Sequence, residues 1–332
     1  MKFGVALLGC GTVGTGVLRL LERNREEIFA KRGVQLEVIG VGVRDLSKPR
    51  PGVNAPITDE LRGLVEDPSV HIVIEAMGGV EPAKTLIQAA IRAKKHVVTA
   101  NKELMAKHGH EIRELARENG VDVRMEAAVA AGIPVIGAIE RLLGANRIER
   151  MEGVVNGTTN FILTEMAKTG RSFDDVLAEA QRIGFAEADP SSDVDGWDAA
   201  YKLCLLARVA TGIHIPLERI SVAGIRPVTI EMQSEAKAHG RVIKLIASLD
   251  VTQTPFVASV EPKSIPAEHP LASLEGGTNG ILLQGDPVGE LFWRGPGAGG
   301  DATASALMGD VVDIAAAVSL GERPVPRPWR NL

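Results

Sequence analysis

Cysteine is scarce in this chain of 332 residues, and its two cysteines, Cys10 and Cys204, lie far apart. Two distant cysteines make neither a disulfide framework nor a paired-cysteine metal site, so the sequence indicates a reducing compartment. Both are expected to be small, buried, apolar side chains. The seven histidines show no metal-ligand spacing. His108 and His110, two apart on a predicted helix, point in different directions.

Long apolar runs are also missing. No segment has about 18 uninterrupted apolar residues, so no membrane-spanning helix is expected. The N-terminal sequence MKFGVALLGCGTVG has one lysine and an apolar run, as secretion signals do. The run is short and broken by glycines, and no cleavage site follows it. We therefore expect a cytoplasmic protein whose first apolar run is a strand.

A strong excess of positive charge is absent as well. The net charge is −5 and the isoelectric point is about 5.9, so no nucleic-acid-binding surface is expected. Hydrophobic residues make up 45% of the chain and charged residues 24%, which is typical of a globular protein with a sizeable core. The length is sufficient for two domains.

Strands and helices alternate in the first part of the sequence. Apolar runs predict strands at 2–8, 34–43, 70–76, 96–99 and 121–125, and helical patterns fall between them at 15–30, 81–93 and 103–119. This alternation is typical of a parallel sheet with helices on both faces.

The pattern changes after about residue 133. Helices are predicted at 134–143, 160–169, 172–183 and 198–211, and strands at 148–155, 238–249, 256–262, 280–285 and 289–293. The start of 238–249 is also compatible with a helix. A glycine-rich loop at 295–300 precedes a predicted helix at 301–320, and a proline-rich tail follows. The middle region therefore predicts a second sheet.

The first predicted strand and helix are joined by Gly9-x-Gly11-x-x-Gly14, the spacing of dinucleotide-binding loops. The first glycine permits a tight turn, the second lets a pyrophosphate approach the backbone, and the third allows close packing of helix and strand. Amide groups at the helix start favour anionic phosphates. The alternative is a glycine-rich turn that binds nothing.

The turn after the second predicted strand indicates which nicotinamide cofactor is preferred. Arg44 stands first, where NAD sites usually carry an acidic residue, and Asp45 follows it. A cation at this turn suits a 2′-phosphate, which favours NADP over NAD, while Asp45 keeps NAD possible. Lys48 and Arg50 are interpreted as solvated loop charges.

Acidic side chains cluster before the predicted helix that opens near Asp198, at Glu187, Asp189, Asp193 and Asp195. Asp198 and Lys202 are four residues apart, so they share one face of the helix. A lysine held near carboxylates can bind a zwitterionic substrate or transfer a proton. The alternative is a solvated surface ion pair. Asp195 is the first choice to cap the helix.

Several ordered motifs together resemble homoserine dehydrogenase, over about 3–320. They are the opening glycine loop, the segment 98–103 (VTANKE), the segment 126–134 (EAAVAAGIP), the segment 153–160 (GVVNGTTN) and the late loop 297–299 (GAG). The resemblance implies NAD(P)-dependent interconversion of L-aspartate 4-semialdehyde and L-homoserine, in threonine, methionine and isoleucine biosynthesis.

The resemblance also implies roles for individual residues. Lys202 matches the family's proton donor, Lys102 a second active-site lysine, and Phe185 a position where some members carry tyrosine. Substrate contacts are implied at Glu187, Asp193, Asp198, Gly157 and Thr158. Cofactor contacts are implied at Gly9, Gly11, Thr12, Val13, Gly14, Arg44, Met77, Gly78, Thr99, Ala100, Lys102, Gly297 and Gly299.

A monovalent cation, usually sodium, is implied at Glu126 with the backbone carbonyls of Val129, Ala131 and Ile133. The residues leave a second interpretation open, because Glu126 follows a predicted strand and could cap a helix or form a salt bridge. Several small-residue carbonyls follow it in AAVAAGIP, which favours the cation.

The expected fold class is α/β, with a Rossmann-type parallel-sheet domain at 1–134 and an α+β substrate-binding and dimerisation domain at 135–300. The helix from about 301 is expected to pack back onto the first domain, and 321–332 to form an extended tail. The resemblance implies a homodimer. Because the sequence stops at Leu332, the family's C-terminal threonine-sensing domain is expected to be absent.

Three other functions compete with this one. They are another amino-acid dehydrogenase with a Rossmann domain, a sensor that binds NADPH without turnover, and a role in assembly alone. The lysine pair and the NGTTN segment favour homoserine dehydrogenase over the first. A sensor that regulates transcription would carry a DNA-binding helix pair or a basic surface, and the sequence has neither.

Overall fold

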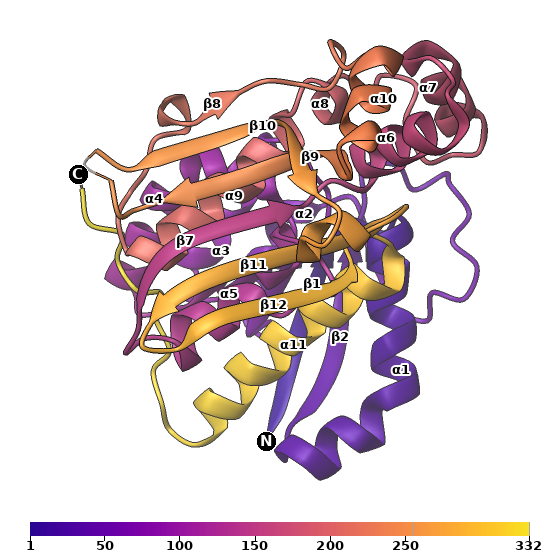
Figure 1. The fold of residues 1–332 in the computed structure, drawn as a ribbon. Helices are drawn as coiled ribbons and strands as arrows, with labels where there is room; N and C mark the ends of the chain where they lie inside the picture. The colour runs from indigo at the N-terminus through magenta and orange to yellow at the C-terminus, as the bar shows by residue number, and fades with distance from the viewer. Residues whose placement is uncertain (254, 332) are drawn as a thin grey trace. The chain divides into compact units, whose positions relative to one another are not determined.

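The computed structural model describes residues 1–253 and 255–331 (Figure 1). The chain forms two compact units. The first comprises Met1–Pro134 together with Gly299–Arg330, and the second comprises Val135–Ala298. The first unit is therefore built from both ends of the sequence.

The first unit contains a parallel sheet of six strands in the order β3-β2-β1-β4-β5-β6. The strands are β1 (Lys2–Leu8), β2 (Gln35–Gly42), β3 (Ile57–Thr58), β4 (Ile72–Glu75), β5 (His96–Thr99) and β6 (Val123–Arg124). Its helices are α1 (Thr12–Arg32), α2 (Leu61–Glu66), α3 (Ala83–Arg92), α4 (Lys102–Asn119) and α11 (Gly300–Ser319), with a 3₁₀ turn, η1, at Glu126–Ala128. The predicted α/β class is confirmed. Sequence reasoning missed β3 and α2, which are too short to show a period.

The strands of this sheet read as apolar runs because both of their faces are covered. All residues of Phe3–Leu8 are buried, as expected for a parallel sheet. Helix α11 packs along α1, where a Cβ on Gly16 would lie 2.9 Å from the backbone oxygen of Gly300. Leu307, Val311 and Ile314 of α11 belong to the same buried core as the apolar residues of α1 and of the sheet. Helix α11 is also long and apolar enough to cross a membrane, but half of its apolar window is buried in the fold.

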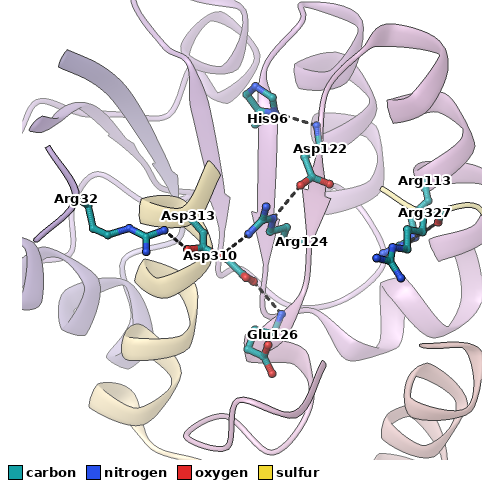
Figure 2. Close-up of polar contacts among 9 residues, drawn as sticks. All are labelled: Arg32, His96, Arg113, Asp122, Arg124, Glu126, Asp310, Asp313 and Arg327. Carbon is teal, nitrogen blue, oxygen red and sulfur yellow. Dashed lines mark hydrogen bonds and ion pairs between the residues drawn. The ribbon is translucent and has the colours of Figure 1, made fainter. Parts of the chain in front are cut away.

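A line of polar contacts joins the sheet to α11 (Figure 2). Arg124 of β6 donates a 2.8 Å hydrogen bond to Asp122 and a 3.1 Å hydrogen bond to Asp313 of α11. Burial alone would lower the pKa of Arg124, but Asp122 and the aspartates of α11 raise it. Asp310 accepts a 3.0 Å hydrogen bond from the backbone N–H of Glu126. The C-terminal helix thus fixes the start of the segment after β6.

The residues after α11 pack on α4. Trp329 is buried, and the Arg113 guanidinium lies 4.5 Å from the centre of its ring. Arg113 also donates a 2.9 Å hydrogen bond to the carbonyl of Arg327. Gly109 leaves room for the indole, because a Cβ there would lie 3.1 Å from it. Stacking of an arginine on tryptophan stabilises the contact by about 1 kcal/mol.

The second unit contains a mixed sheet of six strands in the order β12-β11-β7-β9-β10-β8, in which β8 and β10 are the parallel pair. The strands are β7 (Arg147–Val154), β8 (Ser221–Val222), β9 (Arg241–Asp250), β10 (Val257–Pro266), β11 (Thr278–Asp286) and β12 (Gly289–Pro296). The helices are α5 (Val135–Gly137), α6 (Gly157–Thr169), α7 (Phe173–Arg182), α8 (Ser191–Val194), α9 (Trp197–Thr211) and α10 (Ile230–Ala238). Short turns are η2 (Ala138–Leu142), η3 (Leu217–Arg219) and η4 (Pro270–Ser273).

Two predicted elements of this unit differ from the structure. The helix expected at 134–143 is a single α-turn that continues as the π-helical η2. The strand expected to begin at residue 238 begins at Arg241, because α10 runs to Ala238 and Gly240 then turns the backbone in the left-handed conformation, with φ +66°. Glycine adopts this conformation without a steric penalty.

Candidate active site

Two glycines of the opening loop are required by packing alone. Gly9 has φ +96°, and a Cβ there would lie 2.6 Å from the carbonyl oxygen of Ala76, after β4. A Cβ on Gly14 would lie 2.1 Å from the carbonyl oxygen of Gly9. Both distances are far below van der Waals contact. These two glycines let α1 start directly at the end of β1.

Gly11 is different, because apart from its two chain neighbours no heavy atom in the described part of the chain lies within 4 Å of the position its Cβ would take. Its φ of −88° is open to any residue. It is the N-cap of α1, and no side chain caps that helix in the described part of the chain. The amides of Thr12 and Val13 therefore begin a helix beside open space, an arrangement that suits a pyrophosphate.

The loop lies at the point where the strand order reverses, since β1 pairs with β2 on one side and with β4 on the other. Ligands of doubly wound sheets bind beyond the carboxyl ends of the strands at this point. The loop after β4 contains Met77 and Gly78, and their backbone N–H groups donate to one oxygen of Glu75, at 2.8 and 3.1 Å.

Glu75 was missed by sequence reasoning. Its side chain is fully buried, and its second oxygen accepts a 2.5 Å hydrogen bond from the hydroxyl of Thr99, the last residue of β5. One carboxylate thus holds both loops beyond the sheet. Because the Thr99 hydroxyl is engaged by Glu75, its expected cofactor contact would have to come from the backbone. An acidic residue ending the apolar run VHIVIE was the available signal.

Lys102 is the first residue of α4 and is half-buried. Its position is set by the preceding Asn101, whose side chain accepts a 3.1 Å hydrogen bond from the N–H of Leu104 and donates a 2.6 Å one to the carbonyl of Gly79. Asparagine is a preferred helix N-cap for this reason. Ala100 donates its N–H to the carbonyl of Glu75 at 3.2 Å.

The turn after β2 leaves Arg44 exposed. Asp45 accepts hydrogen bonds from the hydroxyl and N–H of Ser47, at 2.6 and 2.9 Å, and these lower the pKa of Asp45. Arg50 folds back onto the loop, donating to the carbonyls of Lys48 and Asp45, both at 2.9 Å. The Arg50 guanidinium is thus bound to its own loop, in contrast to the exposed Arg44.

The segment after β6 has a constrained backbone. Glu126 is 7% exposed. Ala130 and Ala131 have φ of +50° and +28°, where residues other than glycine are uncommon. Val129, Ala131 and Ile133 are buried. Among residues 1–253 and 255–331, no three His, Cys, Asp or Glu side chains gather as metal ligands, so a cation here would depend on backbone carbonyls.

In the second unit, Lys202 and Asp198 form a buried ion pair. The Lys202 ammonium donates a 2.7 Å hydrogen bond to Asp198 and a 2.6 Å one to the carbonyl of Val155. Lys202 is 8% exposed and Asp198 is 5% exposed. The shared helix face is therefore confirmed, and the alternative of a solvated surface pair is wrong. Buried pairs of this kind require further hydrogen bonds to offset the loss of water.

Asn156 supplies those bonds, and sequence reasoning gave it no role. Its amide nitrogen donates to Asp198 at 2.8 Å and to Asp193 at 2.7 Å. Its amide oxygen caps α6 by accepting from the N–H of Thr159 at 2.8 Å. Asparagine is a good helix N-cap, but the predicted helix began only at residue 160, and the carboxylate partners of Asn156 lie about 40 residues further along the chain.

The first residues of α6 lie beside the Phe185 loop. Thr158 donates a 3.2 Å hydrogen bond to the carbonyl of Phe185. The ring of Phe185 stacks on that of Phe161, with 4.9 Å between the ring centres. A Cβ on Gly157 would lie 3.2 Å from the Cα of Gly277. Glu187, two residues after Phe185, is exposed. Of the expected substrate residues in this unit, Gly157 and Thr158 are thus packed at the start of α6, whereas Glu187 lies on an exposed loop.

The expected cap of α9 was wrong. Its N-cap is Gly196, with φ +89°, and Asp195 instead accepts a 2.5 Å hydrogen bond from Arg226. The N-cap position of α9 has a left-handed backbone. Glycine adopts this conformation without a steric penalty, whereas an aspartate there would be strained.

The late glycine loop contributes to each unit separately. In the second unit, Gly297 lies against Asn279, because a Cβ on Gly297 would lie 1.9 Å from the Asn279 Cγ. In the first unit, Gly299 has φ +115° and precedes α11. Gly300 then packs on Thr12, with a Cβ-to-Thr12 distance of 3.0 Å. The start of α11 therefore lies beside the start of α1.

Two family models match almost the whole chain. "Homoserine dehydrogenase, NAD binding domain" matches residues 9–126, and "Homoserine dehydrogenase" matches residues 134–312. The chain belongs to the homoserine dehydrogenase family. The first match includes the glycine loop, Glu75 and Lys102, and the second includes Asn156, Asp198 and Lys202.

Individual relatives agree with this assignment. Homoserine dehydrogenase of Synechocystis sp. is 44% identical over 99% of this chain and 77% of its own length. The crystal structure of a homoserine dehydrogenase from Thiobacillus denitrificans has 44% identity and a TM-score of 0.96, over 98% of this chain and 76% of that one. A hyperthermophilic archaeal homoserine dehydrogenase in complex with NADPH has 29% identity and a TM-score of 0.81, over 99% and 100%.

The two cysteines are expected to differ in reactivity. Burial raises the pKa of the Cys204 thiol to about 11, and its sulfur donates to the carbonyl of Ile215 at 3.5 Å. At pH 8 about one Cys204 thiol in a thousand would be ionised, and the thiolate is the reactive form. Cys10 lies half-buried within the glycine loop.

A thiol reagent such as DTNB should therefore react with Cys10 in the native protein, and with Cys204 only after unfolding. NADPH should slow the reaction of Cys10 if the glycine loop binds it. Time-resolved absorbance of the released thiolate, with Cys10→Ser as the control, measures both. Equal reaction rates of the two thiols would contradict the prediction.

Proposed function

We propose that Lys202 supplies the proton in the interconversion of L-aspartate 4-semialdehyde and L-homoserine. The observation that supports this role is the buried Lys202–Asp198 pair, held by Asn156 in the segments that match the family. A bound nicotinamide supplies or accepts the hydride. An ammonium group stabilises the developing alkoxide and then protonates it, and in the reverse direction the neutral amine accepts the proton of the hydroxyl group.

The amino-acid part of the substrate is proposed to bind to the second unit. Its ammonium group requires acceptors, and Glu187 and Asp193 are the proposed carboxylates, together with Asp198. Its carboxylate is proposed to face Gly157 and Thr158, at the N-terminus of α6, where the helix dipole favours an anion. Lys102, at the family's second lysine position, is proposed as a further catalytic group.

The preferred cofactor is proposed to be NADP(H), with NAD(H) possible, bound by the first unit. Gly11, Thr12 and Val13 would contact the pyrophosphate, as the open space beside Gly11 supports. The other proposed contacts are Gly9, Gly14, Arg44, Met77, Gly78, Thr99, Ala100, Lys102, Gly297 and Gly299. The archaeal relative in complex with NADPH supports the same choice.

Replacing Arg44 with alanine is expected to lower kcat/KM for NADP relative to that for NAD by about tenfold. The reason is the loss of a charge-assisted hydrogen bond to the 2′-phosphate, which contributes about 1.5–3 kcal/mol. Steady-state rates with both cofactors measure the ratio. Lys48→Ala, which removes another exposed charge of the same loop, is the control and should leave the ratio within about twofold.

A monovalent cation, sodium by preference, is proposed to bind Glu126 and the carbonyls of Val129, Ala131 and Ile133. The buried carboxylate and the left-handed backbone at Ala130 and Ala131 fit such a group, because oxygen ligands suit hard cations. We further propose a homodimer formed through the second unit and a cytoplasmic location. Neither nucleic acid nor membrane is a proposed partner.

The direct test is absorbance of the reduced nicotinamide while L-homoserine is offered with NADP and, separately, with NAD. Turnover dependent on homoserine is the expected result. Oxidation of other amino alcohols or amino acids at higher kcat/KM would reassign the substrate. Binding of NADPH by a folded protein without any turnover would overturn the proposed activity.

A further inference from the structure

Lys244 is a buried cation that the reaction does not use. It lies on β9 and is 4% exposed. Its ammonium group donates three hydrogen bonds, to the side chains of Asn160 and Thr164 on α6, at 2.8 and 3.0 Å, and to the carbonyl of Leu274, at 2.5 Å. An ammonium group has three N–H donors, so all of them are used.

All three acceptors are neutral, which distinguishes Lys244 from Lys202. Burial lowers the pKa of Lys244 to about 8. The charged and titratable groups on the elements around it include Glu165 and Lys168 on α6, Glu261 and Lys263 on β10, Glu275, and the pair His269–Glu152, with Lys263 directly opposite Lys244 in the strand register. Lys168 and Glu275 pair with each other at the surface, at 2.7 Å. A buried ammonium without a carboxylate ligand carries a desolvation cost, which its three hydrogen bonds offset only in part.

The groups that Lys244 binds hold one segment of chain, 274–278, between η4 and β11. Asn160 donates its amide nitrogen to the carbonyl of Gly276 at 3.0 Å, while its oxygen accepts from Lys244. Leu274 accepts from Lys244 directly. The ammonium therefore fixes this segment both directly and through Asn160.

The same segment packs against the start of α6. The Cα of Gly277 lies 3.2 Å from the position of a Cβ on Gly157, and a Cβ on Gly277 would lie 3.3 Å from the ring of Phe185. The carbonyl of Gly277 also accepts a 3.4 Å hydrogen bond from the N–H of Gly297. Movement of the segment would thus be felt by Gly157, Phe185 and the late glycine loop.

We propose that Lys244 is a positioning residue for homoserine, whose ammonium group holds the segment 274–278 against Gly157 and Phe185. The inference rests on the substrate-binding role proposed for Gly157 and Thr158. A neutral amine has two N–H donors, so deprotonation releases one of the three acceptors and loosens the segment. Affinity for homoserine should then fall, while the proton transfer at Lys202 is unchanged.

Lys244→Gln and Lys244→Met test this in the full-length protein. Both should raise KM for homoserine about tenfold or more and change kcat less than about threefold, the pattern of lost binding that is equal in ground and transition states. KM for NADP should stay within about twofold. Lys168→Met is the matched control, since it removes an exposed lysine that holds the same segment, and such pairs contribute little.

The pH dependence separates positioning from a purely structural role. In the unmodified enzyme, KM for homoserine should rise as pH passes about 8. In Lys244→Gln it should be raised at all pH values and should lack this step. If Lys244→Met does not fold, Lys244→Gln still provides both readouts.

Unchanged KM for homoserine in a folded Lys244→Gln would overturn the inference. A fall in kcat that is as large as the rises in KM for homoserine and for NADP would overturn it too. Failure of the proposed function gives a different result, because the unmodified protein would then show no turnover dependent on homoserine, and an error in the role of Lys202 alone would leave turnover in Lys202→Met. The two outcomes are therefore distinguishable in the same assay.

Discussion

Lys202→Met is expected to lower kcat for homoserine oxidation by about 10³-fold, because proton transfer by a positioned side chain contributes about 10²–10⁴-fold. KM for both substrates should change much less, since the lost interaction is made with the developing alkoxide and not with the ground state. Steady-state absorbance of the reduced nicotinamide at saturating substrates measures the effect.

The substitution also disturbs the fold, and the experiment must separate the two effects. Asp198 is 5% exposed and would lose its ammonium partner while keeping its 2.8 Å hydrogen bond from Asn156. Removing one partner of a buried ion pair costs about 3–5 kcal/mol of unfolding free energy. In the double variant Asp198→Asn with Lys202→Met, no charge is left unpaired, so most of that stability should return.

Turnover should not return with the stability. The unfolding free energy, from urea unfolding, and kcat should be measured on the same preparations. In the double variant the unfolding free energy should be near normal, while kcat should remain as low as in Lys202→Met. Lys263→Met, a lysine substitution on β10 in the same unit, should leave both quantities nearly unchanged. Turnover within about tenfold of the unmodified enzyme in a folded Lys202→Met would remove Lys202 from the mechanism.

The pair itself was predictable because its geometry is local. Asp198 and Lys202 are one helical turn apart, and the period of α9 places them on one face. The β1 strand, the glycine loop and α1 were predictable for a similar reason. An apolar run, a glycine spacing and a helical pattern follow one another without interruption.

The residues that support the pair were not predictable, because their contacts are long-range. Asn156 lies 37 and 42 residues before its two carboxylate partners, and a helix N-cap was the whole of its local signal. Glu75 lies 24 residues before Thr99, to which it is bonded. Lys244 lies 84 residues after Asn160. A buried polar group is recognisable only once its partners are in place.

Elements too short to repeat their period were missed for another reason. The two residues of β3 and the six of α2 cannot show an alternation or a helical repeat. The error at Asp195 was one of backbone conformation. Aspartate is a good N-cap, but the turn before α9 needs φ +89°, and Gly196 supplies it.

Glycine substitutions in the opening loop should separate folding from cofactor binding. In Gly14→Ala, the new Cβ would lie 2.1 Å from the carbonyl oxygen of Gly9, so the start of α1 must move away from the end of β1. Overpacking of this kind costs about 1–3 kcal/mol, and sometimes more. Stability and NADPH affinity should therefore fall together.

In Gly11→Ala, the new Cβ would meet no heavy atom of the described residues within 4 Å beyond its two chain neighbours. The backbone there, with φ −88°, is open to alanine, so the unfolding free energy should change by less than about 0.5 kcal/mol. The methyl group would instead occupy the space that a pyrophosphate needs to reach the amides of Thr12 and Val13. We expect the Kd for NADPH to rise about tenfold or more, which corresponds to about 1.4 kcal/mol.

Urea unfolding and NADPH fluorescence titration, applied to both variants, test the contrast. The decisive result is the order of effects: Gly14→Ala loses stability and binding, whereas Gly11→Ala loses binding alone. Normal NADPH affinity in Gly11→Ala would show that no phosphate approaches this amide, and the cofactor site would have to lie elsewhere on the sheet. A loss of stability in Gly11→Ala equal to that in Gly14→Ala would instead mean that all three glycines serve the turn. The loss of NADPH affinity would then reflect the changed fold and not contact with the pyrophosphate. Only a loss of affinity without a loss of stability indicates that a ligand approaches the open space beside Gly11.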